Sequence, residues 1–213
     1  MFDADKWSYT VRAGRARLAL EKNGFDAVVA PAAADAAALV MEFIKPGATV
    51  GFGGSMTVRA LGIQEKAAAA GATLLDHNAP GLSAEEKYGI LRSELTCDVF
   101  ISSVNAVTLK GEMLNVDGNG NRVAALTFGP RKTIVVVGAN KIVADEAEGW
   151  ARIEAKASPM NNKRLEKDNP CVKTGQCMDC DSPGRICRVY QILRRKPSLS
   201  DFTVILVAES LGY

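Results

Sequence analysis

Short apolar segments alternate with amphipathic ones along most of the chain. The apolar segments are bounded by residues such as glycine and proline, which is typical of buried strands. We expect strands at residues 25–30, 49–54, 72–76, 97–104, 132–138 and 202–209. The intervening periodicity predicts helices at 6–24, 33–45, 56–70, after a Ser83–Glu86 capping box, at 123–128 and at 143–158. This alternation favours an α/β fold, a doubly wound, mostly parallel sheet with helices on both faces.

The alternation stops near Pro159, where a polar stretch and then a cysteine-rich segment follow. We therefore divide the chain into an α/β domain at 1–159, a C-terminal cysteine-rich excursion at 160–200, and a final segment at 201–213. The last segment is so apolar that it requires burial, and we expect its strand to return to the main sheet.

Composition narrows the class of protein. The 213 residues include 26 Lys and Arg against 24 Asp and Glu, a net charge of +2, and this balance argues against broad nucleic-acid binding. Pro31 and Asp35 interrupt the longest apolar stretches before they reach membrane-spanning length, and the acidic start MFDADKW is unlike a signal peptide. We expect a cytoplasmic protein with no membrane partner.

His77 is the single histidine, and we expect a hydrogen-bonded residue at a strand end rather than a catalytic one.

A glycine-rich segment joins the predicted strand at 49–54 to the next helix. Its candidate ligand-binding residues are Gly51, Gly53, Gly54, Ser55 and Thr57. The glycines allow a tight turn and close approach to a ligand, and the hydroxyls and helix N-terminus suit an anion. Met56 stands where a dinucleotide fingerprint has its third glycine, so the sequence disfavours NAD, although Asp76 lies where a ribose-binding acid would. A tight turn without a ligand is the alternative interpretation.

The polar stretch at 104–122 leaves a predicted strand at its carboxyl end, the edge where open α/β sheets bind ligands. Candidate ligand contacts at this edge are Asn105, Asn115, Asp117, Asn140 and Lys141. Lys141 can neutralise a carboxylate or phosphate. Asp117, Lys141 and Glu209, the last at the end of the final strand, are the candidates for catalysis. A surface hairpin and an ordinary solvated lysine would also fit this pattern.

Four of the five cysteines lie within 17 residues. They are Cys171, Cys177, Cys180 and Cys187. In a reduced compartment such a cluster more often binds metal than forms disulfides. Four thiolates suit zinc and a [4Fe–4S] cluster equally, and buried or disulfide-paired cysteines are the alternative. Cys97 is expected to be a small core residue.

Several segments of the chain resemble the LUD-domain family, the lactate-utilisation proteins of the LutC/YkgG type. The similar segments are 50–62, 98–130, 134–143, 170–188 and 204–213, which are distributed along the chain from residue 50 to residue 213. The resemblance implies a fold like the NagB/RpiA/CoA-transferase group, in which a glycine loop holds a phosphate or an acyl-CoA. It also implies a link to oxidation of lactate to pyruvate alongside iron–sulfur subunits. Short members of the family can lack the cysteine segment, and no established catalytic residue carries over.

Two functions follow from these observations. The first is an enzyme or redox subunit that handles a small carboxylate, or an acyl- or CoA-transferase-like enzyme, with an anion-binding glycine loop and a metal site made of the four clustered cysteines. The second is a regulatory or assembly protein that binds a phosphorylated metabolite or CoA ester, with a structural zinc. The sequence leaves open iron–sulfur partner subunits and a homodimer.

Overall fold

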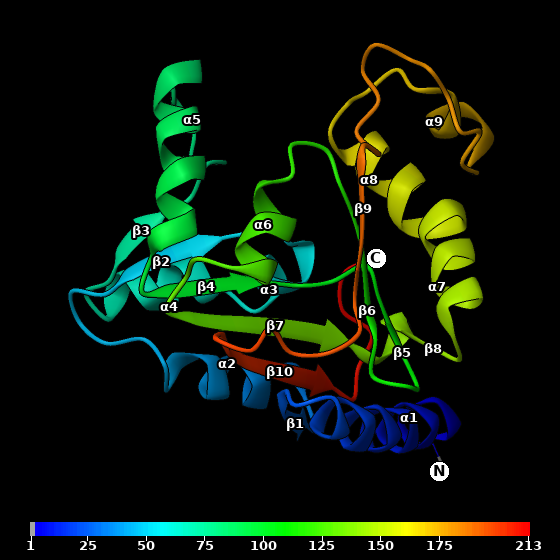
Figure 1. Cartoon of the computed structure of the whole chain (residues 1–213), viewed down its shortest axis with the longest axis horizontal. Helices are drawn as coiled ribbons and strands as arrows, with labels where there is room; N and C mark the ends of the chain where they lie inside the picture. Colours follow the sequence, from blue (N-terminus) through cyan, green and yellow to red (C-terminus); the bar gives the residue numbers. More distant parts are fainter. Residues whose placement is uncertain (1–2) are drawn as a thin grey trace.

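The computed structural model of the chain describes residues 3–213, and Met1 and Phe2 of the predicted acidic start lie outside these residues. Within them, six parallel strands form one sheet in the order β1-β10-β7-β4-β2-β3 (Figure 1). The strands are β1 (Asp26–Ala30), β2 (Thr49–Phe52), β3 (Thr73–Leu75), β4 (Val99–Ser102), β7 (Lys132–Gly138) and β10 (Asp201–Val207). The last strand of the chain returns between β1 and β7, as the sequence predicts.

Helices cover both faces of this sheet, which confirms the doubly wound α/β fold. The helices of one face are α1 (Ala4–Lys22) and α6 (Asn121–Thr127), and those of the other are α2 (Ala33–Met41), α3 (Met56–Ala60) and α4 (Ile63–Ala69). The alternation along β7 shows the two cores directly. Val135 belongs to the core cluster that contains Leu20 of α1, whereas Ile134 belongs to the cluster that contains Val40 of α2.

The predicted helix at 56–70 is two helices in the structure. Gly62 has a φ of 62°, a left-handed conformation that suits glycine, and it forms the start of α4. The predicted capping box is confirmed at α5 (Ala84–Ser93), where Ser83 and Glu86 cap each other reciprocally. This helix projects away from the sheet (Figure 1), and its Tyr88 is 63% exposed. The 3₁₀ helix η1 (Glu94–Thr96) follows α5 directly and leads into β4.

A second sheet of four strands in the described part of the chain stands beside the first, and the sequence does not predict it. Its order is β8 (Ile142–Val143), β5 (Ala106–Thr108), β6 (Met113–Asp117) and β9 (Val189–Leu193). The polar stretch at 104–122 does form a hairpin, but the hairpin is buried, with Val107 and Met113 in the core. At its turn, Gly111 has a φ of 78°, and a Cβ there would lie 2.6 Å from the backbone of Ala19 in α1.

The C-terminal part of the chain begins with a long helical stretch. It consists of α7 (Glu146–Arg152), a π-helical turn (Ile153–Ala157) and α8 (Ser158–Arg164), so the expected boundary at Pro159 falls inside it. The short helix α9 (Pro170–Thr174) opens the cysteine segment, and β9 then pairs antiparallel with β6. Along residues 3–213, no helix combines the length and apolarity needed to cross a bilayer.

Candidate functional site

A polar cleft of about 370 Å³ lies where the two sheets and α8 meet. Its walls come from the β2–α3 loop, the segment after β4, the β6–α6 turn, α8 and the end of the chain. Residues that line it include Gly53, Gly54, Ser55, His77, Ser103, Asn105, Asp117, Arg122, Lys141, Arg164 and Tyr213. The cleft therefore opens at the carboxyl ends of β2 and β4, the edge that the sequence predicts.

Lys141 forms the charged floor of this cleft. It ends the 3₁₀ helix η2 (Ala139–Lys141) after β7, and only 4% of its surface is exposed. Its Nζ donates to Thr57 Oγ1 at 2.8 Å and to Ser103 Oγ at 3.1 Å. Burial, reinforced by the positive charges of Arg152 and Arg122, lowers the pKa of Lys141 to about 7. Two neutral oxygens and two cations therefore surround this ammonium.

Arg122 also lines the cleft and holds the polar segment together. Its guanidinium donates to Asn115 Oδ1, Asn105 Oδ1 and the Val116 carbonyl. Asp117 lies 3.9 Å from it, but the Asp117 carboxylate already accepts the backbone N–H groups of residues 119, 120 and 123. Asp117 thus shapes the β6–α6 turn, and its charge also acts on Arg122.

The structure brings only part of the predicted site together. Of the candidates, those that line the cleft are Gly53, Gly54, Ser55, Asn105, Asp117 and Lys141. Thr57 lies directly behind this wall, because its hydroxyl donates to the Leu211 carbonyl and accepts from Lys141. Ser55 caps α3 by accepting the Val58 N–H.

Four other candidates lie outside the cleft lining and have structural partners. Gly51 sits inside β2, where a Cβ would lie 3.1 Å from Cys97 Sγ. Asn115 bridges Arg122 and Gln191 across β6 and β9. Asn140 fixes the chain end through Leu211 N–H and the Gly212 carbonyl. Glu209 accepts the Ala33 N–H at the start of α2. These contacts account for each residue type without a ligand.

Gly53 packs too closely to serve as a simple test of ligand binding. A Cβ at this position would lie 2.9 Å from Ser102 Cβ and closer still to Ser102 Oγ. We expect Gly53→Ala to lower the free energy of unfolding by about 1–3 kcal/mol through overpacking, measured by urea denaturation. Gly89→Ala is the control, because nothing lies within 4 Å of that position and alanine favours helix. Equal stability of the Gly53 variant and the wild type would contradict the packing argument.

Two further cleft residues bear on the chemistry: Arg122 is not among the sequence candidates, and His77 is expected only as a hydrogen-bonded residue at a strand end. Arg122 follows directly on the Asn-Gly-Asn turn, and its position at the end of the polar stretch is the signal that was available. His77 lines the cleft and bonds to the buried Glu94, a pairing across 17 residues that no local pattern reveals.

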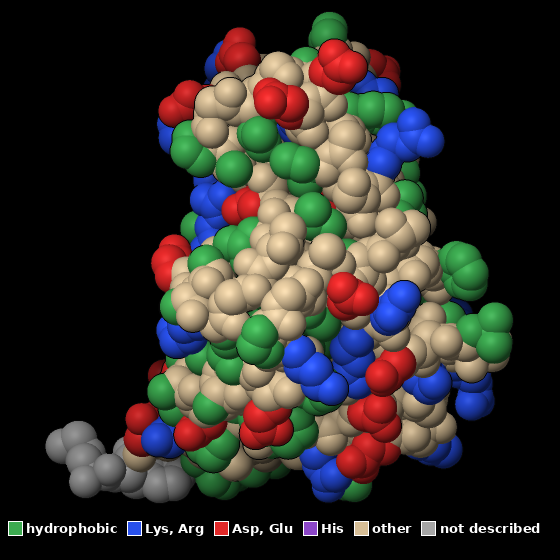
Figure 2. Space-filling view, turned by 90° about the vertical axis from the view of Figure 1, so that its left-hand side faces the viewer, with side chains coloured by type: hydrophobic (Ala, Val, Ile, Leu, Met, Phe, Trp, Pro, Cys, Tyr) green, Lys and Arg blue, Asp and Glu red, His purple; other side chains and the backbone are tan. Residues whose placement is uncertain are grey.

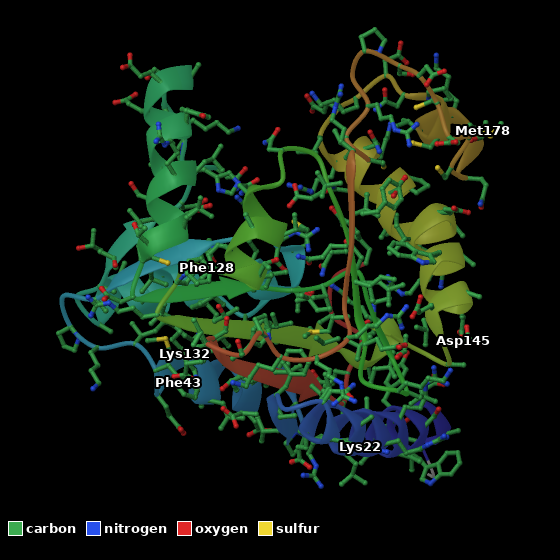
Figure 3. The ribbon with its side chains drawn as sticks, viewed as in Figure 1. Lys22, Phe43, Phe128, Lys132, Asp145 and Met178 are labelled. Carbon is green, nitrogen blue, oxygen red and sulfur yellow. The ribbon has the colours of Figure 1, made fainter. Side chains whose placement is uncertain are left out.

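The four clustered cysteines line one small cavity next to α8 and α9. The cavity measures about 10 Å³ and is also bordered by Met178, which Figure 3 labels in the segment after α9. All four thiols are free, and burial raises the pKa of Cys171 and Cys187. Hydrogen bonds from Ser182 lower the pKa of Cys180. As placed, the described residues contain no group of three or more His, Cys, Asp or Glu side chains arranged to hold a metal ion.

The cysteine cavity adjoins the polar cleft. Ser158, Ile186 and Cys187 line both, and Cys187 Sγ lies 3.5 Å from Ser158 Oγ. One wall therefore separates the cysteines from the space in which a ligand would bind.

Residues 14–207 match the LUD domain family. The chain belongs to this family. Among solved structures, this LUD protein is similar to a DUF162 family protein from Deinococcus radiodurans, with a TM-score of 0.51 and 14% identity, covering 95% of this chain and 98% of that one. At that identity the likeness shows the fold alone. The beta subunit of eIF2B from Chaetomium thermophilum has a TM-score of 0.36 and 18% identity over 53% of this chain and 43% of its own, too low to carry an argument. No curated protein matches the sequence.

Proposed function

We propose that this LUD protein is an enzyme or redox subunit that binds a small carboxylate in the polar cleft, with the carboxylate on Lys141. The observation that carries the proposal is the buried ammonium at the cleft floor, whose two acceptors are both neutral hydroxyls. A buried charge is costly unless it is paired, and an anionic ligand would supply the missing counter-charge.

The charge around the cleft supports an anionic ligand. Its cationic lining residues are Lys87, Arg122, Lys141, Arg164 and Lys167, against the single acid Asp117. Asp117 interacts with Arg122 and offsets one of these charges, so the lining keeps an excess of positive charge. On the face shown in Figure 2, acidic and basic side chains are interspersed. The cleft lining, in contrast, has an excess of positive charge that favours an anion.

A phosphorylated metabolite or CoA ester is the second candidate ligand. The observation in its favour is the size of the cleft, about 370 Å³, together with the cations Lys87, Arg164 and Lys167. Such a ligand would suit a regulatory or assembly role. Calorimetric titration with L-lactate and, separately, with acetyl-CoA separates the two, because the proposal requires saturable binding of the simple carboxylate.

We further propose that Cys171, Cys177, Cys180 and Cys187 hold a zinc ion or a [4Fe–4S] cluster. Four thiolates suit either group chemically and all four cysteines line one cavity, although in the described residues their side chains, as placed, do not form a coordinating group. Zinc would brace the segment, whereas a cluster would supply one-electron transfer. Cys187 borders the cleft as well as the cysteine cavity, so a group held by the cysteines would lie beside the ligand, and iron–sulfur subunits would be the expected partners of a cluster.

Carboxylate affinity should depend on pH through Lys141. Because its pKa is about 7, the ammonium that binds the anion is lost as the pH rises through 7. We expect L-lactate affinity to be constant below about pH 6 and to fall roughly tenfold per pH unit well above 7. Calorimetry at pH 6 to 9, in buffers of different ionisation enthalpy, should show uptake of nearly one proton per ligand at pH 8. Affinity that stays flat from pH 6 to 9 would contradict this role.

A further inference from the structure

His77 is held by a buried carboxylate at the edge of the cleft. It lies just beyond β3, and its Nδ1 is 2.6 Å from Oε1 of Glu94. Glu94 opens η1 and is 1% exposed, and its other oxygen lies 3.5 Å from Asn121 Nδ2. Burial raises the pKa of Glu94, which the hydrogen bond to His77 opposes. The carboxylate is therefore aimed at the imidazole rather than at solvent.

This pairing fixes which nitrogen faces the ligand. An ionised Glu94 can only accept this hydrogen bond, which places the proton on Nδ1 and the lone pair of the neutral ring on Nε2. A Cβ placed on Gly54 would lie 3.6 Å from His77 Nε2 and 3.9 Å from Cε1. The Nε2 edge thus faces the glycine loop, and both residues line the cleft. Among the described residues, Nε2 has no hydrogen-bond partner.

The packing around Glu94 leaves room for its side chain. A Cβ on Gly51 would lie 3.2 Å from Glu94 Cγ, so glycine in β2 leaves the room that the buried glutamate fills. Asp76 adds a second negative charge near Glu94, and Lys87 on α5 lines the same part of the cleft. A histidine oriented by a buried acid, with its other nitrogen open to a ligand, is an arrangement that general acid–base catalysis uses.

We infer that His77 is the acid–base residue of the cleft. Its Nε2 accepts a proton from a hydroxyl of the bound ligand: the O–H bond breaks, the N–H bond forms, and the electron pair stays on oxygen. Glu94 stabilises the resulting imidazolium, and the proton returns along the same path. Glu94 is a positioning residue, and the step rests on the proposed function in that it needs a ligand in the cleft.

Because His77 is the single histidine, its chemistry can be followed without interference. In protein labelled with 15N-histidine, NMR should show the Nδ1–H tautomer. Diethyl pyrocarbonate should modify the free protein at Nε2, followed at 240 nm, and saturating L-lactate should slow this reaction at least tenfold. Lactate that binds by calorimetry without slowing the modification would overturn the inference and leave the proposed function standing.

If L-lactate does not bind, the proposed ligand is wrong. The tautomer and the reactivity of the imidazole still test the inference about His77. An Nδ1–H tautomer with a reactive Nε2 would support the inference. An Nε2–H tautomer, or a histidine that diethyl pyrocarbonate does not reach in the folded protein, would overturn it.

Variants separate a chemical role from a merely structural one. In lactate-dependent reduction of a dye, His77→Gln should lower kcat by about 10²- to 10⁴-fold and leave KM nearly unchanged. Glu94→Gln should lower kcat less, and the exposed Glu85→Gln should not change it. Added imidazole should restore part of the activity of His77→Ala. A loss of thermal stability with unchanged kcat would assign the pair a structural role only.

Discussion

Replacing Lys141 with methionine should abolish carboxylate binding and at the same time make the protein more stable below pH 7. The variant removes the ammonium on which the anion rests, so L-lactate affinity should fall at least about 30-fold, the low end for loss of one partner of a buried charge pair. Methionine has a similar length and carries no charge to desolvate. Thr57 and Ser103 keep acceptors in the carbonyls of Leu211 and Val104, so no hydroxyl is stranded.

The gain in stability has a defined pH window. The pKa of Lys141 is lowered from its usual 10.5 to about 7, so between these values the unfolded chain binds more protons than the folded one. Wild-type stability therefore rises as the pH rises above 7, and the methionine variant lacks this slope. We expect Lys141→Met to be more stable by about 1–4 kcal/mol at pH 6, with the advantage shrinking by pH 9.

The matched control is Lys110→Met, at an exposed lysine in the β5–β6 turn outside the cleft lining. It should change neither lactate affinity nor the pH slope of stability, both measured by calorimetry and urea denaturation. Lactate affinity that survives in Lys141→Met would show that the ammonium is not the anion site. If Lys141→Met is less stable than the wild type at pH 6, the hydrogen bonds of Lys141 stabilise the folded protein more than the burial of its charge destabilises it.

The second large effect concerns the cysteine cavity. Protein purified without oxygen should carry metal on the four clustered cysteines, and Cys180→Ser should lose it. Cys97→Ala is the control, since Cys97 lies in the core, where its thiol donates a hydrogen bond to the Glu94 carbonyl. The metal content, the acid-labile sulfide content and the visible spectrum are measured for each protein. About one zinc per chain would indicate a structural site, whose removal lowers the unfolding midpoint.

Iron with sulfide and visible absorption would instead indicate a cluster, and turnover would then disappear with the chromophore. The proposal fails if the purified protein has no metal and four titratable thiols. It also fails if Cys180→Ser retains the metal content of the wild type.

The parallel sheet could be predicted because its signals are local. A run such as Val135–Val137 is apolar on both sides, and a strand buried on both faces requires this composition. The second sheet could not be predicted, because β6 pairs with β9 across about 75 residues and nothing in either segment encodes its partner. The place of Lys141 after a strand predicts a ligand contact, but its burial depends on the return of the chain end near Gly212.

The interactions of the remaining site residues could not be predicted from the sequence either. His77 is oriented by its hydrogen bond to Glu94, and Arg122 by its hydrogen bonds to Asn105 and Asn115. Tertiary packing brings these partners together. Glu209 does lie at the expected edge, two residues after the end of β10, yet its carboxylate turns to the start of α2. Position along a strand predicts the edge of the sheet, whereas side-chain direction depends on neighbours that are distant in the sequence.

A crystal structure of the protein with L-lactate at pH 6 tests the role of the cleft most directly. The ligand carboxylate should lie within about 2.7–3.2 Å of Lys141 Nζ, between the glycine loop and Arg122. Lactate bound elsewhere, or a cleft that stays empty of it at saturating concentration, would contradict the proposed function.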